Sequence, residues 1–170
     1  MEKRHTISVL VENEFGVLAR IAGLFAQKGY NIESLSVSPT TDATLSRMTI
    51  VTVGNDHVVQ QIIKQLDKLI NVLRVEDLSH EKHVTRELFL VKLEGRSRSR
   101  SEAEKLALEM GGKLIDYSAA AFVVEVTGNE EEGTSCLEKL KKQGILEVVR
   151  TGVIAVQRGE HVLVSPKEKL

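Results

Sequence analysis

Hydrophobic and polar residues follow two different periods along the first half of the chain. Four segments alternate and are rich in β-branched residues, which predicts strands with one buried face. These segments span residues 6–11, 30–38, 46–53 and 72–78. Apolar residues recur every three or four positions after the first strand and again after the third, which predicts two amphipathic helices. The predicted order is therefore βαββαβ.

Residues at the ends of both helices support this assignment. The two apolar stripes are Val17, Leu18, Ile21, Leu24 and Phe25, then Val59, Ile62, Ile63, Leu66, Leu69 and Ile70. Gly29 follows the first stripe, where a left-handed residue is expected to end a helix. Asn55 and Asp56 precede the second stripe and can cap its N-terminus.

The same order recurs in the second half of the chain. Strands are predicted at residues 86–93, 113–117, 122–127 and 145–156. One helix spans residues 102–110 and stops at Gly111 and Gly112, and another follows Asn129 and ends at Gly144. We predict an α+β protein of two ferredoxin-like domains. They occupy residues 1–78 and 84–170, with a linker at 79–83.

Each predicted sheet carries both of its helices on one face. Such a sheet leaves its other face open, and domains of this size bury a small fraction of their surface. We therefore expect the open face or the sheet edges to need a partner. A homodimer is the simplest closed arrangement.

The composition of the chain limits the kinds of partner that it is expected to bind. Its 170 residues carry a net charge of -1, which gives no field to gather phosphates. An RNA-binding module of this topology should stack bases on aromatic side chains, and the strands at 6–11 and 47–53 have none. We expect no nucleic-acid partner. The N-terminus lacks a secretory signal and the chain lacks a long apolar run, so we expect a cytoplasmic protein with no membrane association.

A search for catalytic chemistry finds no recognisable arrangement. The chain has no Walker-type phosphate loop, no H-E-x-x-H, no C-x-x-C and no G-x-S-x-G motif. Cys136 falls on a helical apolar stripe with Leu137 and Leu140, which favours a core position. We interpret the five histidines, His80 and His83 of the linker included, as solvated surface residues. No catalytic residue and no metal ligand is predicted.

Three arginines precede the helix predicted at residues 102–110. Arg96, Arg98 and Arg100 alternate with serines, and a phosphate-binding tract at a helix N-terminus is one interpretation. The other is a solvated loop in which Ser101 and Glu104 form a capping box. We favour the loop, although it could still dock an acidic partner.

The turn between the first strand and the first helix is the strongest candidate for a binding site. Unpaired backbone N–H groups and the helix dipole at this point favour an anion such as the carboxylate of an amino acid. Gly16 would let a ligand approach the backbone, or it would merely ease the turn. Asn13 could accept from a ligand ammonium group or simply cap the helix.

Several extended segments resemble one protein family. They are V-E-N-E-F-G-V-L-A-R-I-A-G-L-F-A-Q-K-G-Y-N-I-E-S-L-S-V, T-L-S-R-M-T-I-V and Q-L-D-K-L-I-N-V-L-R-V in the first half, and E-L-F-L-V-K-L, G-G-K-L-I-D and V-V-R-T-G-V in the second. Together they resemble the small regulatory subunits of acetohydroxyacid (acetolactate) synthase. The segment G-Y-N-I-E-S-L is especially specific.

This resemblance implies an N-terminal ACT domain and a subunit that performs no chemistry itself. The chain would bind no cofactor. It would bind and activate a catalytic large subunit that carries thiamine diphosphate, magnesium and FAD, and it would confer feedback inhibition by valine or another branched-chain amino acid. A small ferredoxin-like enzyme such as an acylphosphatase is the alternative, but no arginine adjoins Asn13 in the first turn.

The resemblance also implies which residues bind the effector. In the family, paired ACT domains form a homodimer and hold the effector at their interface. Carried onto this sequence, one chain supplies Asn13, Gly16, Val17 and Leu18, and its partner supplies Asn31 and Ile32.

Overall fold

The computed structural model describes residues 2–164. Contacts between Cα atoms divide the chain into two compact units. The first consists of residues 2–84 together with 153–164, and the second of residues 85–152. Each unit is built around one antiparallel sheet.

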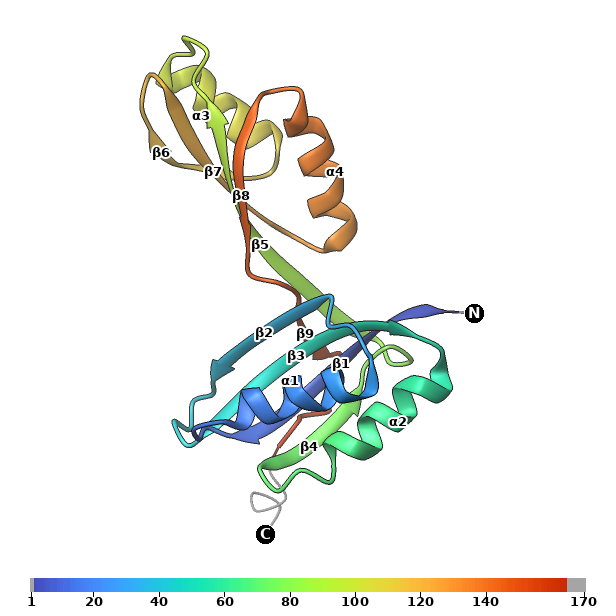
Figure 1. Cartoon of the computed structure of the whole chain (residues 1–170). Helices are drawn as coiled ribbons and strands as arrows, with labels where there is room; N and C mark the ends of the chain where they lie inside the picture. The colour runs from blue at the N-terminus through green and yellow to red at the C-terminus, as the bar shows by residue number, and fades with distance from the viewer. Residues whose placement is uncertain (1, 165–170) are drawn as a thin grey trace. The chain divides into compact units, whose positions relative to one another are not determined.

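The first unit has the predicted βαββαβ order. Its elements are β1 (Lys3–Glu12), α1 (Val17–Lys28), β2 (Ser34–Pro39), β3 (Leu45–Gly54), α2 (Asp56–Leu66) and β4 (Val72–Asp77). The strands lie in the order β2-β3-β1-β4, and all neighbours are antiparallel. Both helices cover one face of this sheet (Figure 1). The predicted ferredoxin-like topology is confirmed.

The core of the first unit lies between the sheet and its two helices. It is formed by Ile7, Val9, Val11, Met48 and Ile50 of the sheet and Val17, Ile21, Phe25, Val59, Ile62 and Leu66 of the helices. These residues recur at the strand and helix periods from which the elements were predicted. Gly29 ends α1 in the left-handed conformation with φ 69°, and Asn55 caps α2 by accepting from the N–H of Val58 at 2.9 Å.

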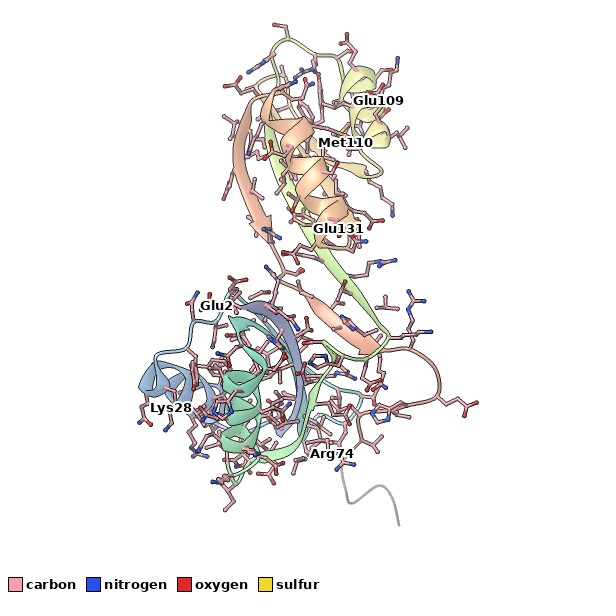
Figure 2. The ribbon with its side chains drawn as sticks, turned by 90° about the vertical axis from the view of Figure 1, so that its right-hand side faces the viewer. Glu2, Lys28, Arg74, Glu109, Met110 and Glu131 are labelled. Carbon is pink, nitrogen blue, oxygen red and sulfur yellow. The ribbon has the colours of Figure 1, made fainter. Side chains whose placement is uncertain are left out.

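The second unit repeats this topology. Its elements are β5 (His83–Glu94), α3 (Arg100–Glu109), β6 (Lys113–Tyr117), β7 (Ala121–Gly128), α4 (Glu130–Lys141) and β8 (Ile145–Arg150), with the strand order β6-β7-β5-β8. Figure 2 shows Glu131 in α4, where an acidic first turn complements the helix dipole. Within residues 2–164, no helix is both long and apolar enough to cross a membrane.

The last part of the chain differs from the prediction. One strand was expected at residues 145–156, but the chain breaks between β8 and β9 (Ile154–Gln157). Gly152 adopts a left-handed φ of 77° at this break. Residues 153–164 belong to the first unit, whereas the prediction placed residues 84–170 in one domain, of which 165–170 lie outside the described residues.

This C-terminal segment covers the face of the first sheet that lies away from the helices. The N–H of Ala155 donates to Oγ1 of Thr49 at 3.3 Å, and Nη2 of Arg47 donates to the carbonyl of Ala155 at 3.2 Å. Leu10, Thr49 and Val51 are at most 4% exposed. The chain itself therefore covers the part of the expected open face that lies over β1 and β3. Two edge strands, β2 and β4, remain at the ends of the sheet order.

The corresponding face of the second sheet exposes apolar side chains. Leu90 of β5 lies opposite Val149 of β8, and these residues are 36% and 52% exposed. Leu90 alternates with Phe89 and Val91, which face the helices and form the core of this unit. The second unit thus keeps an apolar surface of the kind that commonly binds a partner.

Two predicted local features prove wrong. The capping box of α3 is formed by Ser99 and Glu102, two residues before the expected pair of Ser101 and Glu104. The interpretation of every histidine as solvated fails for His5, which is 1% exposed. Alternation along β1 places His5 on the same face as Ile7, under the helices.

Two helical glycines test how closely each unit is packed. A Cβ on Gly133 of α4 would lie 2.1 Å from Cζ of Phe89, whereas one on Gly23 of α1 would meet no atom within 4 Å. We expect Gly133→Ala to lower the free energy of unfolding by about 1–3 kcal/mol through overpacking. Gly23→Ala should raise it by about 0.5–1 kcal/mol. Guanidinium unfolding of both variants checks this, and effects of the same sign would contradict the described packing.

Candidate functional site

The turn that leads from β1 into α1 leaves the start of the helix uncapped. Gly16 occupies the N-cap position with φ 80° and ψ -4°, and no side chain accepts a hydrogen bond from the first turn of α1. No acidic residue lies in that first turn either. Helix N–H groups in this situation are available to an anion, which the helix dipole also favours. The first turn therefore has the chemistry of a carboxylate site.

The space beside Gly16 is open on the side where a side chain would project. A Cβ at this position would meet one side-chain atom within 4 Å, Nη2 of Arg20 at 3.9 Å. Arg20 lies one helical turn after Gly16, so its guanidinium group adds positive charge next to the uncapped N–H groups. Arg20 was not among the site residues predicted from the sequence. The spacing of four residues from Gly16 was the signal that could have identified it.

Asn13 is held in place by the β2–β3 turn. Its backbone N–H donates to the carbonyl of Thr44 at 2.7 Å, and its Nδ2 donates to the carbonyl of Ala43 at 2.9 Å. The alternative that Asn13 caps α1 is therefore wrong. With Nδ2 engaged, the carbonyl oxygen Oδ1 is the atom that could accept from a ligand.

Asp42 organises the turn that Asn13 contacts. Its Oδ1 accepts from Oγ1 of Thr44 at 2.6 Å and from the N–H of Thr44 at 2.8 Å. These two hydrogen bonds stabilise the carboxylate and hold the pKa of Asp42 below its ordinary value. The turn is thus locally ordered even though Asp42 is exposed.

A buried asparagine links the first turn to the start of β4. Asn71, which is 7% exposed, donates through Nδ2 to Glu12 at 2.7 Å and to Glu14 at 3.3 Å. Its Oδ1 accepts from Arg20, and its carbonyl accepts from the N–H of Glu12 at 2.9 Å. Asn71 therefore fixes both the acidic side chains of the turn and the guanidinium group beside Gly16. Asn71 acquires this role because it meets the first turn in the fold, although the two lie far apart in the sequence.

Val17 and Leu18 contribute differently. Val17 is 4% exposed and packs in the core, so only its backbone can meet a ligand. Leu18 is 42% exposed and can present its side chain. Phe15 is fully exposed and makes no part of the core.

Asn31 and Ile32 lie far from this turn within one chain. The carbonyl of Asn31 accepts from Oγ1 of Thr52 at 2.6 Å, and Thr52 pairs with His5 across the sheet. Glu12, at the start of the first turn, is seven residues further along β1, which corresponds to roughly 23 Å. The structure therefore places the two predicted halves of the effector site at opposite ends of one sheet.

The other candidate sites from the sequence engage in ordinary structural contacts. Burial raises the pKa of the Cys136 thiol, which agrees with the predicted core position. In the arginine loop, Arg96 pairs with Glu94 at 2.7 Å and Arg100 pairs with Glu104 at 3.0 Å. Nη2 of Arg98 donates to Oε1 of Gln143 at 2.6 Å. These pairings support the interpretation as a loop.

Comparison with known families assigns both halves of the chain. Residues 7–74 match the model for the ACT domain of the type found in AHAS small subunits. The first unit, with its ferredoxin-like sheet and uncapped first turn, is thus an ACT domain. Residues 86–159 match the model for the small subunit of acetolactate synthase. The chain belongs to the family of acetolactate synthase small subunits.

Individual relatives match over nearly their whole length. The isozyme 3 small subunit of Salmonella typhimurium is 45% identical over 94% of this chain and 99% of its own. The probable small subunit of Archaeoglobus fulgidus is 46% identical over 92% of this chain and 98% of its own. The crystal structure of the small subunit from Thermotoga maritima aligns with a TM-score of 0.83 at 33% identity, covering 94% of this chain and 99% of that one.

The role of Asn71 can be tested by truncating its side chain. Asn71→Ala removes the partner of Arg20, Glu12 and Glu14 in a buried position. We expect the free energy of unfolding to fall by about 1–3 kcal/mol, the usual effect of losing buried hydrogen bonds. Urea unfolding measures the change. The exposed Asn31→Ala is the matched control, and an equal loss there would contradict a specific role for Asn71.

Proposed function

We propose that this chain is a non-catalytic regulatory subunit that senses a branched-chain amino acid and modulates a separate catalytic subunit. The observation that carries the proposal is the uncapped N-terminus of α1 at Gly16, in a chain that belongs to the acetolactate synthase small-subunit family. An amino-acid carboxylate suits the start of this helix, where no side chain caps the N–H groups.

The catalytic subunit is the proposed site of the chemistry. Thiamine diphosphate, magnesium and FAD would be bound by that partner, which this chain would activate and make sensitive to the effector. The docking surface for the catalytic subunit would be the apolar face of the second unit that bears Leu90 and Val149, because these apolar side chains are exposed and a partner would bury them.

The effector pocket is proposed to lie between two copies of the chain. Asn13, Gly16, Val17 and Leu18 of one copy would face Asn31 and Ile32 of the other. A two-fold axis reverses the direction of the second sheet, so the first turn of one copy can meet the Asn31 end of its partner. This arrangement brings together residues that lie at opposite ends of a single sheet. It requires a homodimer through the ACT domains.

Three kinds of contact would hold the ligand. The carboxylate would accept from the N–H groups at the start of α1 beside Arg20, and the ammonium group would donate to Oδ1 of Asn13. The aliphatic side chain would pack against Leu18 and Ile32, which are partly exposed. One methylene changes such packing by about 1–3 kcal/mol, so valine, leucine and isoleucine should differ modestly in affinity.

Calorimetric titration with valine tests the first-turn site. Wild type should bind, and Gly16→Asp should lose at least about 100-fold in affinity, because its carboxylate would face that of the ligand. Gly16→Asn requires the same left-handed backbone but adds no charge, so its affinity for valine should fall less. Gly111→Asp is a control for the backbone, since Gly111 also has a left-handed φ of 72° and open space. Unchanged binding by Gly16→Asp would contradict the assignment, as would a wild type that ignores millimolar valine.

Reconstitution with the catalytic subunit from the same cell tests the regulatory role. Wild type should raise acetolactate synthase activity, and valine should then lower it. Gly16→Asp should still activate but resist valine, because the docking surface and the effector site lie in different units. Val149→Lys should have the opposite effect: it should reduce activation of the catalytic subunit and leave valine binding intact. Absence of activation by wild type would refute the subunit proposal.

A further inference from the structure

Four ionisable side chains converge at the opposite end of β1 from the first turn. His5 comes from β1, Asp77 ends β4, Asp56 begins α2, and His80 follows β4 in the loop. Donor atoms of His5, Asp77 and His80 lie within 4.8 Å of one another. All four residues belong to the first unit. The predicted effector site and the sheet core use none of them.

His5 is buried without the hydrogen bonds that a buried imidazole needs. Its side chain is 1% exposed, and among the described residues neither Nδ1 nor Nε2 has a hydrogen-bond partner. Oδ2 of Asp77, on a side chain that is 10% exposed, has no such partner there either. Buried polar atoms are nearly always satisfied, so these three atoms require an explanation.

The separations between these groups are too long for hydrogen bonds. Oδ2 of Asp77 lies 3.6 Å from Nδ1 of His5, and Oδ1 of Asp56 lies 3.7 Å from Nε2 of His5. Oδ1 of Asp56 is also 3.6 Å from Nε2 of His80. Two ligand atoms on one tetrahedral zinc ion lie about 3.3 Å apart, given bonds of about 2.0–2.1 Å. The 3.6 Å between Asp77 and His5 is close to the spacing of two groups that share an ion, and the donor atom of His80 lies within 4.8 Å of both.

We propose that His5, Asp77 and His80 bind a divalent transition-metal ion of the zinc class. Two imidazoles and a carboxylate are a ligand set that zinc readily accepts. His5 has a carboxylate beside each ring nitrogen, so one nitrogen binds the ion and the other donates to the second carboxylate. This carboxylate–histidine–metal arrangement orients ligands in known sites. Asp56 is the orienting carboxylate here.

The surrounding contacts prepare Asp77 and Asp56 for these roles. Oδ1 of Asp77 accepts from the N–H of Ser79 at 2.9 Å and from its hydroxyl, which leaves Oδ2 directed at His5. Oδ2 of Asp56 pairs with Lys3 at 3.7 Å, which leaves Oδ1 to the histidines. His80 is 57% exposed and has the freedom to close the remaining gap. The site is therefore fixed on its buried side and adjustable on its exposed side.

A metal-free explanation makes different predictions. A protonated His5 could pair with the two carboxylates, since Asp77 and Asp56 both face it. In that case His80 would be dispensable and added zinc would not stabilise the fold. The T-shaped approach of the His5 and His80 rings, with centroids 6.2 Å apart, would then be ordinary packing.

The test titrates the full chain, dialysed against a chelator, with zinc and then with cobalt. We expect one zinc ion per chain by calorimetry and visible cobalt absorption bands of a low-coordinate site. At about a hundredfold excess over Kd, zinc should raise the melting midpoint by roughly 5–10 °C. His80→Gln, which replaces an exposed residue, should lose at least about 100-fold in affinity, and Asp56→Asn about 10- to 100-fold.

The exposed His57→Gln is the matched control, because His57 adjoins Asp56 but points to a different partner, Gln61 at 3.0 Å. It should bind zinc as wild type does. Failure of wild type to bind zinc or cobalt stoichiometrically would overturn the proposal, as would full affinity and unchanged cobalt bands in His80→Gln. Valine binding is read separately, so this outcome does not depend on the regulatory proposal.

Discussion

A four-stranded sheet that carries both helices on one side must still cover its other side. In the first unit the chain meets this constraint itself, because the segment around Ala155 lies on the face that bears Leu10 and Thr49. Polar groups on that face are satisfied by the segment, as Arg47 shows by donating to Ala155. Covering β1 and β3 on this face leaves the sheet edges and the helix N-terminus as further places for partners.

Local periodicity was sufficient to predict the two folds but insufficient to predict contacts between distant segments. The stripe through Ile21 and Phe25 and the alternation through Ile7 and Val9 both appear in the core as predicted. Gly152, by contrast, divides a segment that reads as one continuous strand. Apolar alternation continues across the break, so only the left-handed glycine could have signalled that the chain changes unit there.

In the candidate sites too, residues whose role depends on their sequence neighbours could be predicted, and residues whose role depends on distant segments could not. Gly16 and Asn13 could be selected because an anion site at a helix start depends on a few adjacent residues. Asn71 and Arg20 were not predicted, because their structural role arises from hydrogen bonds between β1, α1 and the start of β4. His5 was missed for the same reason. Its neighbours Asp56 and Asp77 are separated from it by more than 50 positions and meet it only in the fold.

The two proposed sites share one strand and are therefore expected to influence each other. His5 pairs with Thr52, whose hydroxyl donates to the carbonyl of Asn31, the residue proposed to face the effector of a second copy. An ion that fixes His5 would also fix this part of the sheet. Any coupling must be reciprocal, so an ion that strengthens effector binding would itself bind more tightly when effector is present. Typical couplings of about 1–3 kcal/mol correspond to about 5- to 150-fold in affinity, which is large enough to matter in regulation.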